Sequence, residues 1–200
     1  MTPWRCGDIA TLWPTCNSGS QLVSEQPFIL VLGGARSGKS GYAERLARAG
    51  GRPVTYLATA GPARDAEMAA RIAAHQARRP PEWVTLEVTH ALDEAIRTAR
   101  DILLIDCLTL WLTNLMLDEH DIDGATQSVV AALDARRAPV IAVANEVGEG
   151  IVPATPLGRA FRDRQGMLNQ RLARAADTVV KMVAGYPLVV KPNPHPEPTL

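Results

Sequence analysis

The chain has 200 residues, 46% of them hydrophobic, which is enough for one domain, and its 21 basic and 21 acidic side chains give a formal net charge of zero. This balance gives no support for a nucleic acid or an acidic membrane surface as the principal partner, and the apolar runs are too short for a membrane span. The three cysteines, Cys6, Cys16 and Cys107, lack metal-ligand spacing, which favours free thiols in a reducing cytoplasm.

The two ends of the chain differ from the rest. Residues 1–27 show neither helical nor strand periodicity and contain Pro, Gly and Ser throughout, so we expect a disordered extension without the layout of a signal peptide. Residues 192–200 form a tail in which proline recurs at every second position up to Pro198, and such a segment cannot form regular structure. The domain proper is therefore predicted to span residues 28–191.

An apolar run at residues 28–32 predicts a buried strand that leads directly into a P-loop pattern. In such a loop the glycines let backbone N–H groups turn toward phosphate oxygens, and the following helix adds its positive N-terminal end. Lys39 would reach the β- and γ-phosphates, and the Ser40 hydroxyl would bind Mg²⁺. An ordinary glycine turn also fits the bare pattern, but the helix-compatible residues 40–49 favour a nucleotide site. The predicted nucleotide contacts are Gly33, Gly34, Ala35, Arg36, Ser37, Gly38, Lys39 and Ser40.

Strands and helices are predicted to alternate along the rest of the chain. We predict strands at residues 53–59, 82–88, 101–107, 139–144, 178–183 and 188–191, and helices at residues 64–79, 90–100, 108–117, 125–137 and 157–176. This alternation predicts an α/β fold of the P-loop, RecA-like class, with a mostly parallel sheet and helices on both faces. In such a sheet ligands bind beyond the carboxyl ends of the strands, where Asp106 takes the place of a Walker B acid.

The helix predicted at residues 64–79 carries Glu67, Arg71, His75 and Arg79 at intervals of four, so that they share one face. Two neighbouring cations disfavour imidazolium, and a neutral, nucleophilic ring would then persist beside groups that attract phosphate. Such a histidine could attack the α-phosphorus of a nucleotide and form a phosphoramidate. From the spacing alone, a solvated face of a surface helix explains the pattern better.

Five motifs follow one another in order within residues 28–191. They are Gly33-Gly-Ala-Arg-Ser-Gly-Lys-Ser40, Glu67-Met-Ala-Ala-Arg-Ile-x-x-His75 with Arg79-Pro80, Asp106-Cys-Leu-Thr-x-Trp-Leu-Thr-Asn114, Asn145-Glu-Val-Gly-x-Gly-Ile-Val-Pro153 and Phe161-Arg-Asp-x-x-Gly-x-x-Asn-Gln170. Together they resemble the bifunctional adenosylcobinamide kinase/adenosylcobinamide-phosphate guanylyltransferases of cobalamin biosynthesis. Five motifs in register are far more specific than a P-loop alone, and they change the interpretation of the histidine.

The resemblance implies two reactions on one scaffold. Adenosylcobinamide would be phosphorylated with ATP or GTP, and GMP would then pass from GTP to the product through His75, giving adenosylcobinamide-GDP. It also implies a catalytic role for Lys39, a Mg²⁺ cofactor held by Ser40 and Asp106, and a homo-oligomer resembling a trimer. Nucleotide contacts outside the P-loop are implied for Ala58, Thr59, Ala60, Glu87 and Asp106, and the charged helix face adds Arg71 and Arg79 as predicted contacts.

Some roles stay open at this point. Glu87 could accept hydrogen bonds from guanine or ribose, or be a carboxylate at the rim. Asn145 and Glu146 could serve the corrinoid side chain or the nucleotide of a neighbouring subunit, or belong to a plain left-handed turn. Arg162 and Asp163 are expected to form a structural or intersubunit ion pair. At the level of function, a single-activity small-molecule kinase and a RecA-like nucleotide-binding switch are the alternatives, and covalently bound GMP would exclude both.

Overall fold

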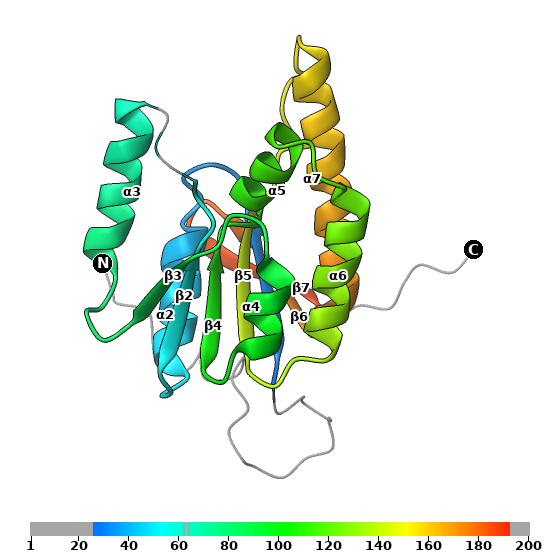
Figure 1. Ribbon diagram of the computed structural model, residues 1–200. Helices are drawn as coiled ribbons and strands as arrows, with labels where there is room; N and C mark the ends of the chain where they lie inside the picture. Colours follow the sequence, from blue (N-terminus) through cyan, green and yellow to red (C-terminus); the bar gives the residue numbers. More distant parts are fainter. Residues whose placement is uncertain (1–25, 62, 64, 193–200) are drawn as a thin grey trace.

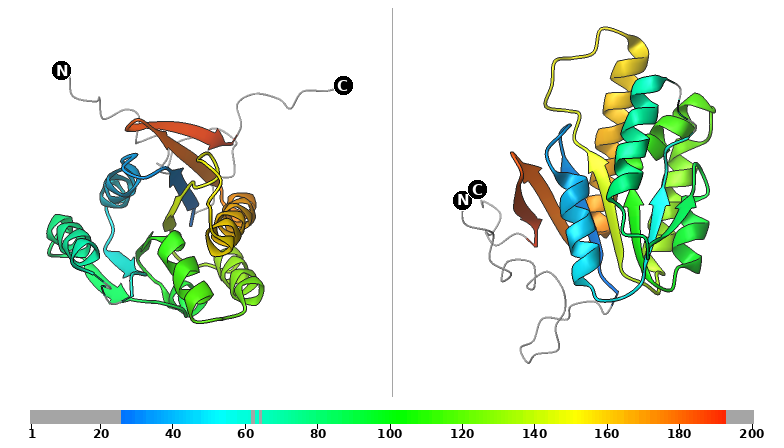
Figure 2. Two further views of the ribbon diagram at one scale, coloured as in Figure 1. Left: turned by 90° about the horizontal axis from the view of Figure 1, so that it is seen from above. Right: turned by 90° about the vertical axis from the view of Figure 1, so that its left-hand side faces the viewer.

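A computed structural model of the chain describes residues 26–61, 63 and 65–192. The predicted N-terminal extension, apart from its last two residues, and the proline-rich tail after Pro192 lie outside the described residues. The described part forms a seven-stranded sheet with helices on both faces, as Figures 1 and 2 show. The predicted α/β architecture is confirmed.

The elements follow the predicted alternation. The strands are β1 (Phe28–Gly33), β2 (Val54–Ala58), β3 (Val84–Glu87), β4 (Ile102–Asp106), β5 (Val140–Asn145), β6 (Thr178–Val183) and β7 (Tyr186–Lys191). The helices are α2 (Lys39–Ala49), α3 (Ala66–Arg78), α4 (Leu92–Thr98), α5 (Leu108–Leu117), α6 (Ile122–Asp134) and α7 (Pro156–Ala175).

Most boundaries shift by one or two residues, and three elements differ from the prediction for identifiable reasons. The helix expected at residues 90–100 is shorter, because the segment before Leu92 is a loop whose His90 carbonyl accepts the indole N–H of Trp111. Helix α6 begins before Gly124 rather than after it, because the Asp121 side chain accepts the Gly124 N–H and caps the helix. Strand β7 is longer than expected, because it pairs antiparallel with β6 across a tight turn and, as an edge strand, tolerates a proline.

The strand order is β3-β2-β4-β5-β1-β6-β7, and all neighbouring strands are parallel except the antiparallel pair β6 and β7. Strand β1 lies inside the sheet, and alternate residues along it pack on opposite faces. Phe28 and Leu30 join a core cluster with α4, α5, α6 and α7. Ile29 and Val31 join a second cluster with α2. Burial on both faces is why this strand is an unbroken apolar run.

Helix α3 is the least buried helix of the fold. None of its described side chains is fully buried, and only Ile72 and His75 are half-buried. In Figure 1 it stands beside the β3 edge of the sheet, away from the other helices. Among the described residues, no helix is long and apolar enough to cross a membrane.

Candidate active site

The P-loop joins β1 to α2 in a conformation that requires glycine at two positions. Gly38 has φ of 90°, a left-handed value that other residues rarely adopt. At Gly33 an added Cβ would lie 2.5 Å from Ser37 Oγ and 3.1 Å from Met182 Cβ, closer than the packing allows. The loop therefore curls tightly over the end of β1, and α2 starts directly after it.

Lys39 folds back across this loop. Its Nζ donates a hydrogen bond to the Gly34 carbonyl at 3.1 Å. Burial lowers the pKa of the Lys39 ammonium, against an opposing effect of Cys107 and Asp106. The Ser37 hydroxyl in the same loop is buried and has no hydrogen-bond partner among the described residues. A lysine and an unpaired hydroxyl thus lie where the loop would hold phosphate.

Asp106, at the carboxyl end of β4, connects three other elements. Its Oδ1 lies 3.3 Å from Ser40 Oγ on α2, and its Oδ2 accepts the Tyr56 hydroxyl of β2 at 2.5 Å. Oδ2 also lies 3.3 Å from His75 Nδ1 on α3. Burial alone would raise the pKa of Asp106, but the hydrogen bonds from His75, Tyr56 and Ser40 lower it below its ordinary value. The carboxyl group is therefore an ionised acceptor shared by the P-loop and the histidine.

His75 is oriented by this carboxylate. A carboxylate only accepts hydrogen bonds, so the proton of this contact is on Nδ1, and Nε2 is the ring nitrogen that does not face Asp106. Arg71 and Arg79 are the charged neighbours of His75 expected from the sequence, and the fold adds the carboxylate of Asp106 to them. Arg71 belongs to the same helix, but its side chain lies outside the described part of the structure. Glu67 is exposed on the first turn of α3.

Arg79 lies just beyond the end of α3, and its guanidinium carbon is 3.8 Å from the centroid of the Tyr56 ring. This is the geometry of a cation–π contact. The Arg79 Nε is buried and has no hydrogen-bond partner among the described residues. Tyr56 thus joins Arg79 and Asp106 in one cluster. No motif in the sequence marks Tyr56, and the only signal for it is that a tyrosine within an apolar strand needs a partner for its hydroxyl.

The end of β2 lies beside the same carboxylate. Ala58 pairs in register with Asp106 on one side and with Glu87 on the other. The buried Thr59 hydroxyl accepts the Cys107 N–H at 2.8 Å and donates to the Cys107 carbonyl at 2.7 Å, so it holds β2 to the start of α5. The exposed Glu87 lies at the same edge, and the nucleotide contacts of residues 58–60 and of Glu87 stay predictions.

The oxygens of Ser40 and Asp106 suit a magnesium ion. The two oxygen atoms lie 3.3 Å apart, and oxygen is the ligand atom that Mg²⁺ prefers. Mg²⁺ usually takes only one or two protein carboxylates together with phosphate oxygens and water. In the described part of the chain, no group of three His, Cys, Asp or Glu residues could hold a metal by itself. A metal here would therefore depend on the nucleotide for its remaining ligands.

The two later motifs are partly structural. Glu146 donates its N–H to the Gly33 carbonyl at 3.0 Å, and its carboxylate accepts the Gly148 N–H at 3.1 Å, so this loop is tied to the P-loop. Arg162 and Asp163 form an ion pair of 2.9 Å within the chain, as the structural alternative predicted.

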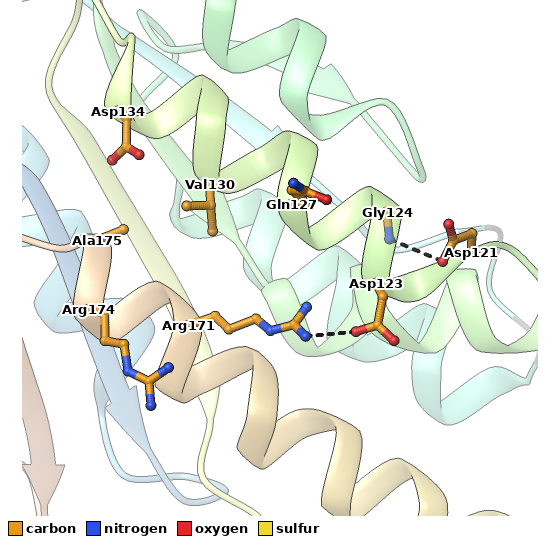
Figure 3. A pocket seen from close by; sticks show the side chains of 9 residues that line it. All are labelled: Asp121, Asp123, Gly124, Gln127, Val130, Asp134, Arg171, Arg174 and Ala175. Atoms are coloured by element: carbon orange, nitrogen blue, oxygen red, sulfur yellow. Dashed lines mark hydrogen bonds and ion pairs between the residues drawn. The ribbon is translucent and has the colours of Figure 1, made fainter.

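A groove of about 780 Å³ between α6 and α7 lies on the other face of the sheet from α2. Figure 3 shows Arg171 turned toward Asp123 across it, and their ion pair measures 2.9 Å. The groove contains none of the predicted site residues. The groove is lined by Asp121, Asp123, Gly124, Gln127, Val130, Asp134, Arg171, Arg174 and Ala175.

Replacing Tyr56 by phenylalanine is expected to destabilise the fold at pH 7 by about 1.5–3 kcal/mol, the range for a hydrogen bond to a charged group. The pKa of Asp106 is lower in the folded state than in the unfolded state. Its contribution to the free energy of unfolding is therefore complete above about pH 3.9, and it is lost as the pH falls from there through the folded-state pKa. The difference between Tyr56→Phe and wild type should therefore shrink below pH 4. Urea unfolding at several pH values measures it.

The control for this measurement is Tyr42→Phe, which removes the hydroxyl of another buried tyrosine, on α2. It should leave the difference from wild type independent of pH in the same range. Equal stability of Tyr56→Phe and wild type at pH 7 would contradict the role assigned to the Tyr56 hydroxyl.

The chain was compared with known proteins. A sequence model of the family described as cobinamide kinase / cobinamide phosphate guanyltransferase matches residues 29–190. The bifunctional adenosylcobalamin biosynthesis protein CobP of Pseudomonas aeruginosa is 46% identical over 170 residues, covering 82% of this chain and 98% of the relative. The corresponding protein CobU of Escherichia coli is 41% identical over 181 residues, covering 82% and 99%.

Among solved structures, an ATPase from the type III secretion system of pathogenic bacteria superimposes with a TM-score of 0.50 at 12% identity. The match covers 78% of this chain and 51% of the ATPase chain, and it supports the RecA-like fold only. The alignments with the two sequence relatives cover nearly the whole length of each relative. The family match includes the P-loop, α3 and the end of β4. The chain therefore belongs to the cobinamide kinase / cobinamide phosphate guanyltransferase family.

Proposed function

We propose that this protein phosphorylates adenosylcobinamide with a nucleoside triphosphate and then transfers GMP from GTP to the product through His75. The observation that carries the proposal is the shared position of Asp106. Its carboxylate contacts Ser40 of the P-loop and Nδ1 of His75 at 3.3 Å each. A phosphate-binding loop and a nucleophile for nucleotidyl transfer are thereby joined at one site, as the two activities of the family require.

In the phosphorylation, the hydroxyl oxygen of adenosylcobinamide attacks the γ-phosphorus, the bond to the bridging oxygen of the β-phosphate breaks, and the hydroxyl proton is released. The enzyme contributes mainly positioning and charge neutralisation. Lys39 and the backbone N–H groups of the P-loop hold the phosphates. Mg²⁺, for which Ser40 and Asp106 would supply protein oxygens, adds neutralisation of phosphate charge. Either ATP or GTP meets these requirements, and we propose both as substrates.

In the guanylyl transfer, Nε2 of His75 attacks the α-phosphorus of GTP, and the bond to the β-phosphate oxygen breaks, so that pyrophosphate leaves. A phosphate oxygen of adenosylcobinamide phosphate then attacks the same phosphorus. The N–P bond breaks, adenosylcobinamide-GDP is formed and Nε2 is free again. Asp106 accepts a hydrogen bond from the Nδ1–H group throughout and stabilises the positive charge that develops on the ring.

Incubation of the protein with GTP labelled at the α-phosphate tests this proposal. We expect a covalent adduct that is labile in acid and stable in alkali, as a phosphoramidate is, and that is discharged by adenosylcobinamide phosphate. Phosphorylation of adenosylcobinamide without any adduct would support the single-activity kinase. Nucleotide binding without either reaction would support the switch protein.

We also propose a homo-oligomer, resembling a trimer, in the cytoplasm where nucleoside triphosphates are available. Apolar side chains exposed after β5 support the oligomer, since Ile151 is 97% exposed, and Val152 and Leu157 are 60% exposed. Sedimentation at micromolar concentration is expected to show a species larger than the monomer, and Ile151→Glu should shift it toward the monomer. A wild-type protein that sediments as a monomer would contradict this expectation.

A further inference from the structure

Strand β5 extends past its neighbour β4 at the carboxyl edge of the sheet. The last residue of β4, Asp106, pairs with Val143, whereas Asn145 pairs with Gly33 on the other side. Successive residues of a strand turn their N–H and C=O groups to opposite neighbours. Because the Glu146 N–H is donated to β1, the N–H and C=O of Asn145 point to the side where β4 has already ended.

Three buried side chains replace the missing strand. The Thr109 hydroxyl accepts the Asn145 N–H at 2.8 Å, and the Asn169 amide nitrogen donates to the Asn145 carbonyl at 3.0 Å. Gln165 in turn donates its amide nitrogen to the Asn169 amide oxygen at 2.8 Å. Their exposures are only 6% for Thr109, 5% for Asn169 and 0% for Gln165. The backbone of one residue is thus held from α5 and α7 together.

The direction of this hydrogen-bond chain is set by the Asn145 carbonyl. A carbonyl only accepts, so Asn169 must present its nitrogen to it and its oxygen to Gln165. Gln165 must then present its own nitrogen, which leaves its Oε1 buried without a hydrogen-bond partner among the described residues. An unpaired buried acceptor is costly. The unpaired Gln165 oxygen therefore lowers the stability of the fold at the place where the Asn145 backbone is held.

The side chain of Asn145 lies on the face of the sheet that carries α2, the helix that follows the P-loop. Along β5, Ala142 and Ala144 pack in the cluster with α4 to α7, whereas Ile141 and Val143 pack in the cluster with α2. Alternation places the side chain of Asn145 on the α2 face. The amide is half-buried and has no hydrogen bond to any residue that the structure describes.

Asp106 lies on the same face, because Leu103 and Ile105 of β4 pack on the opposite one. The register places Asn145 two residues beyond the level of Asp106 and beside Gly33, where the P-loop begins. A side-chain amide whose donors are unused is therefore carried by a fixed backbone position between the P-loop and the carboxylate that contacts Ser40.

We propose that the side-chain amide of Asn145 donates a hydrogen bond to the γ-phosphoryl group during its transfer, and that Thr109, Asn169 and Gln165 are positioning residues for this contact. The inference rests on the proposed function in one respect, namely that the P-loop binds the triphosphate whose γ-phosphate is transferred. A hydrogen-bond donor that is already in place where charge develops in the transition state accelerates the reaction, because the protein does not have to rearrange during the reaction.

The first test is Asn145→Ala. We expect kcat for phosphorylation of adenosylcobinamide to fall by about 10²-fold, the scale for one preorganised donor, with KM for the nucleotide changed by less than about 3-fold. The covalent GMP adduct should form at nearly the wild-type rate, because that reaction occurs at the α-phosphorus. An unchanged kcat, or an equal loss of both reactions in a folded protein, would overturn the proposal.

The positioning residues are tested by a pair of variants at one site. Thr109→Val removes the acceptor for the Asn145 N–H at nearly constant volume, and we expect it to reproduce the selective fall in kcat. Thr109→Ser keeps the hydroxyl and should restore the activity. Thr126→Val, which removes a buried hydroxyl on α6, is the matched control and should leave kcat unchanged. A similar loss for Thr126→Val would show that only stability is involved.

A double variant separates positioning from independent effects. If Thr109 acts through Asn145, adding Thr109→Val to Asn145→Ala should lower kcat no further. Losses that multiply would overturn the assignment of Thr109. Thermal unfolding of each variant identifies folded proteins, and Asn145→Asp, which keeps the size of the side chain but removes its donors, replaces Asn145→Ala if that variant does not fold. A wild-type protein without adduct or kinase turnover would instead refute the proposed function.

Discussion

Lys39→Ala is expected to slow phosphorylation of adenosylcobinamide by at least about 10²-fold, the scale for removing one preorganised group that stabilises charge. Lys39 Nζ already lies over the P-loop, 3.1 Å from the Gly34 carbonyl, and binding of phosphate would replace that neutral acceptor with an anionic one. No other described P-loop side chain can take its place, because Arg36 is exposed and Ser37 is neutral.

The fold should survive Lys39→Ala, since the lysine side chain contributes one hydrogen bond, to the Gly34 carbonyl, and α2 is held mainly by buried residues such as Tyr42 and Leu46. Arg45→Ala is the matched control: it removes a cation from an exposed position of the same helix, nearly two turns further on. It should retain turnover within about 3-fold, as surface changes usually do. Turnover near the wild-type value in folded Lys39→Ala protein would remove the P-loop from the mechanism.

The P-loop and the sheet could be predicted because their requirements are local. Gly33 and Gly38 belong to one pattern of eight consecutive residues, which is recognised without any distant contact. A strand buried on both faces must be apolar along its whole length. The same reasoning placed Asp106 at the carboxyl end of its strand. These inferences depend on neighbours in sequence or on a rule that holds for every parallel sheet.

The contacts that join separate elements could not be predicted in this way. His75 and Asp106 meet because α3 lies beside the carboxyl edge of the sheet. The spacing of residues along α3 shows which side chains share one side of the helix, but it does not show which other element lies against that side. The hydrogen-bond chain from Gln165 through Asn169 to Asn145 depends on β5 extending past β4. Relative strand lengths of this kind are set by packing, not by local pattern.

His75→Ala is expected to abolish the GMP adduct and guanylyl transfer while leaving phosphorylation of adenosylcobinamide largely intact. Transfer through a histidine divides one displacement into two, and without the imidazole no neighbour can replace it. Glu67 is exposed on the first turn of α3, and Arg79 is a permanent cation stacked on Tyr56. Phosphorylation needs no enzyme nucleophile, because the substrate hydroxyl attacks the γ-phosphorus directly.

Two control variants make this result specific. Gln76→Ala removes the next, exposed side chain of α3, and His120→Ala removes an exposed histidine of the α5–α6 loop. Both should retain the adduct. If the nucleophile is the only function lost in His75→Ala, free imidazole should restore part of the guanylyl transfer without restoring the label on the protein.

The pattern of loss decides what His75 does. Asp106 contacts both His75 and Ser40, so a merely structural role for the histidine would disturb the carboxylate and slow both reactions together. Loss of both activities in a folded protein would therefore identify His75 as a shared binding or structural residue. Retention of both would mean that this face of α3 is only solvated. Selective loss of guanylyl transfer is the outcome that a nucleophile oriented by Asp106 requires, because the P-loop, Lys39 and the Ser40–Asp106 contact all remain in place.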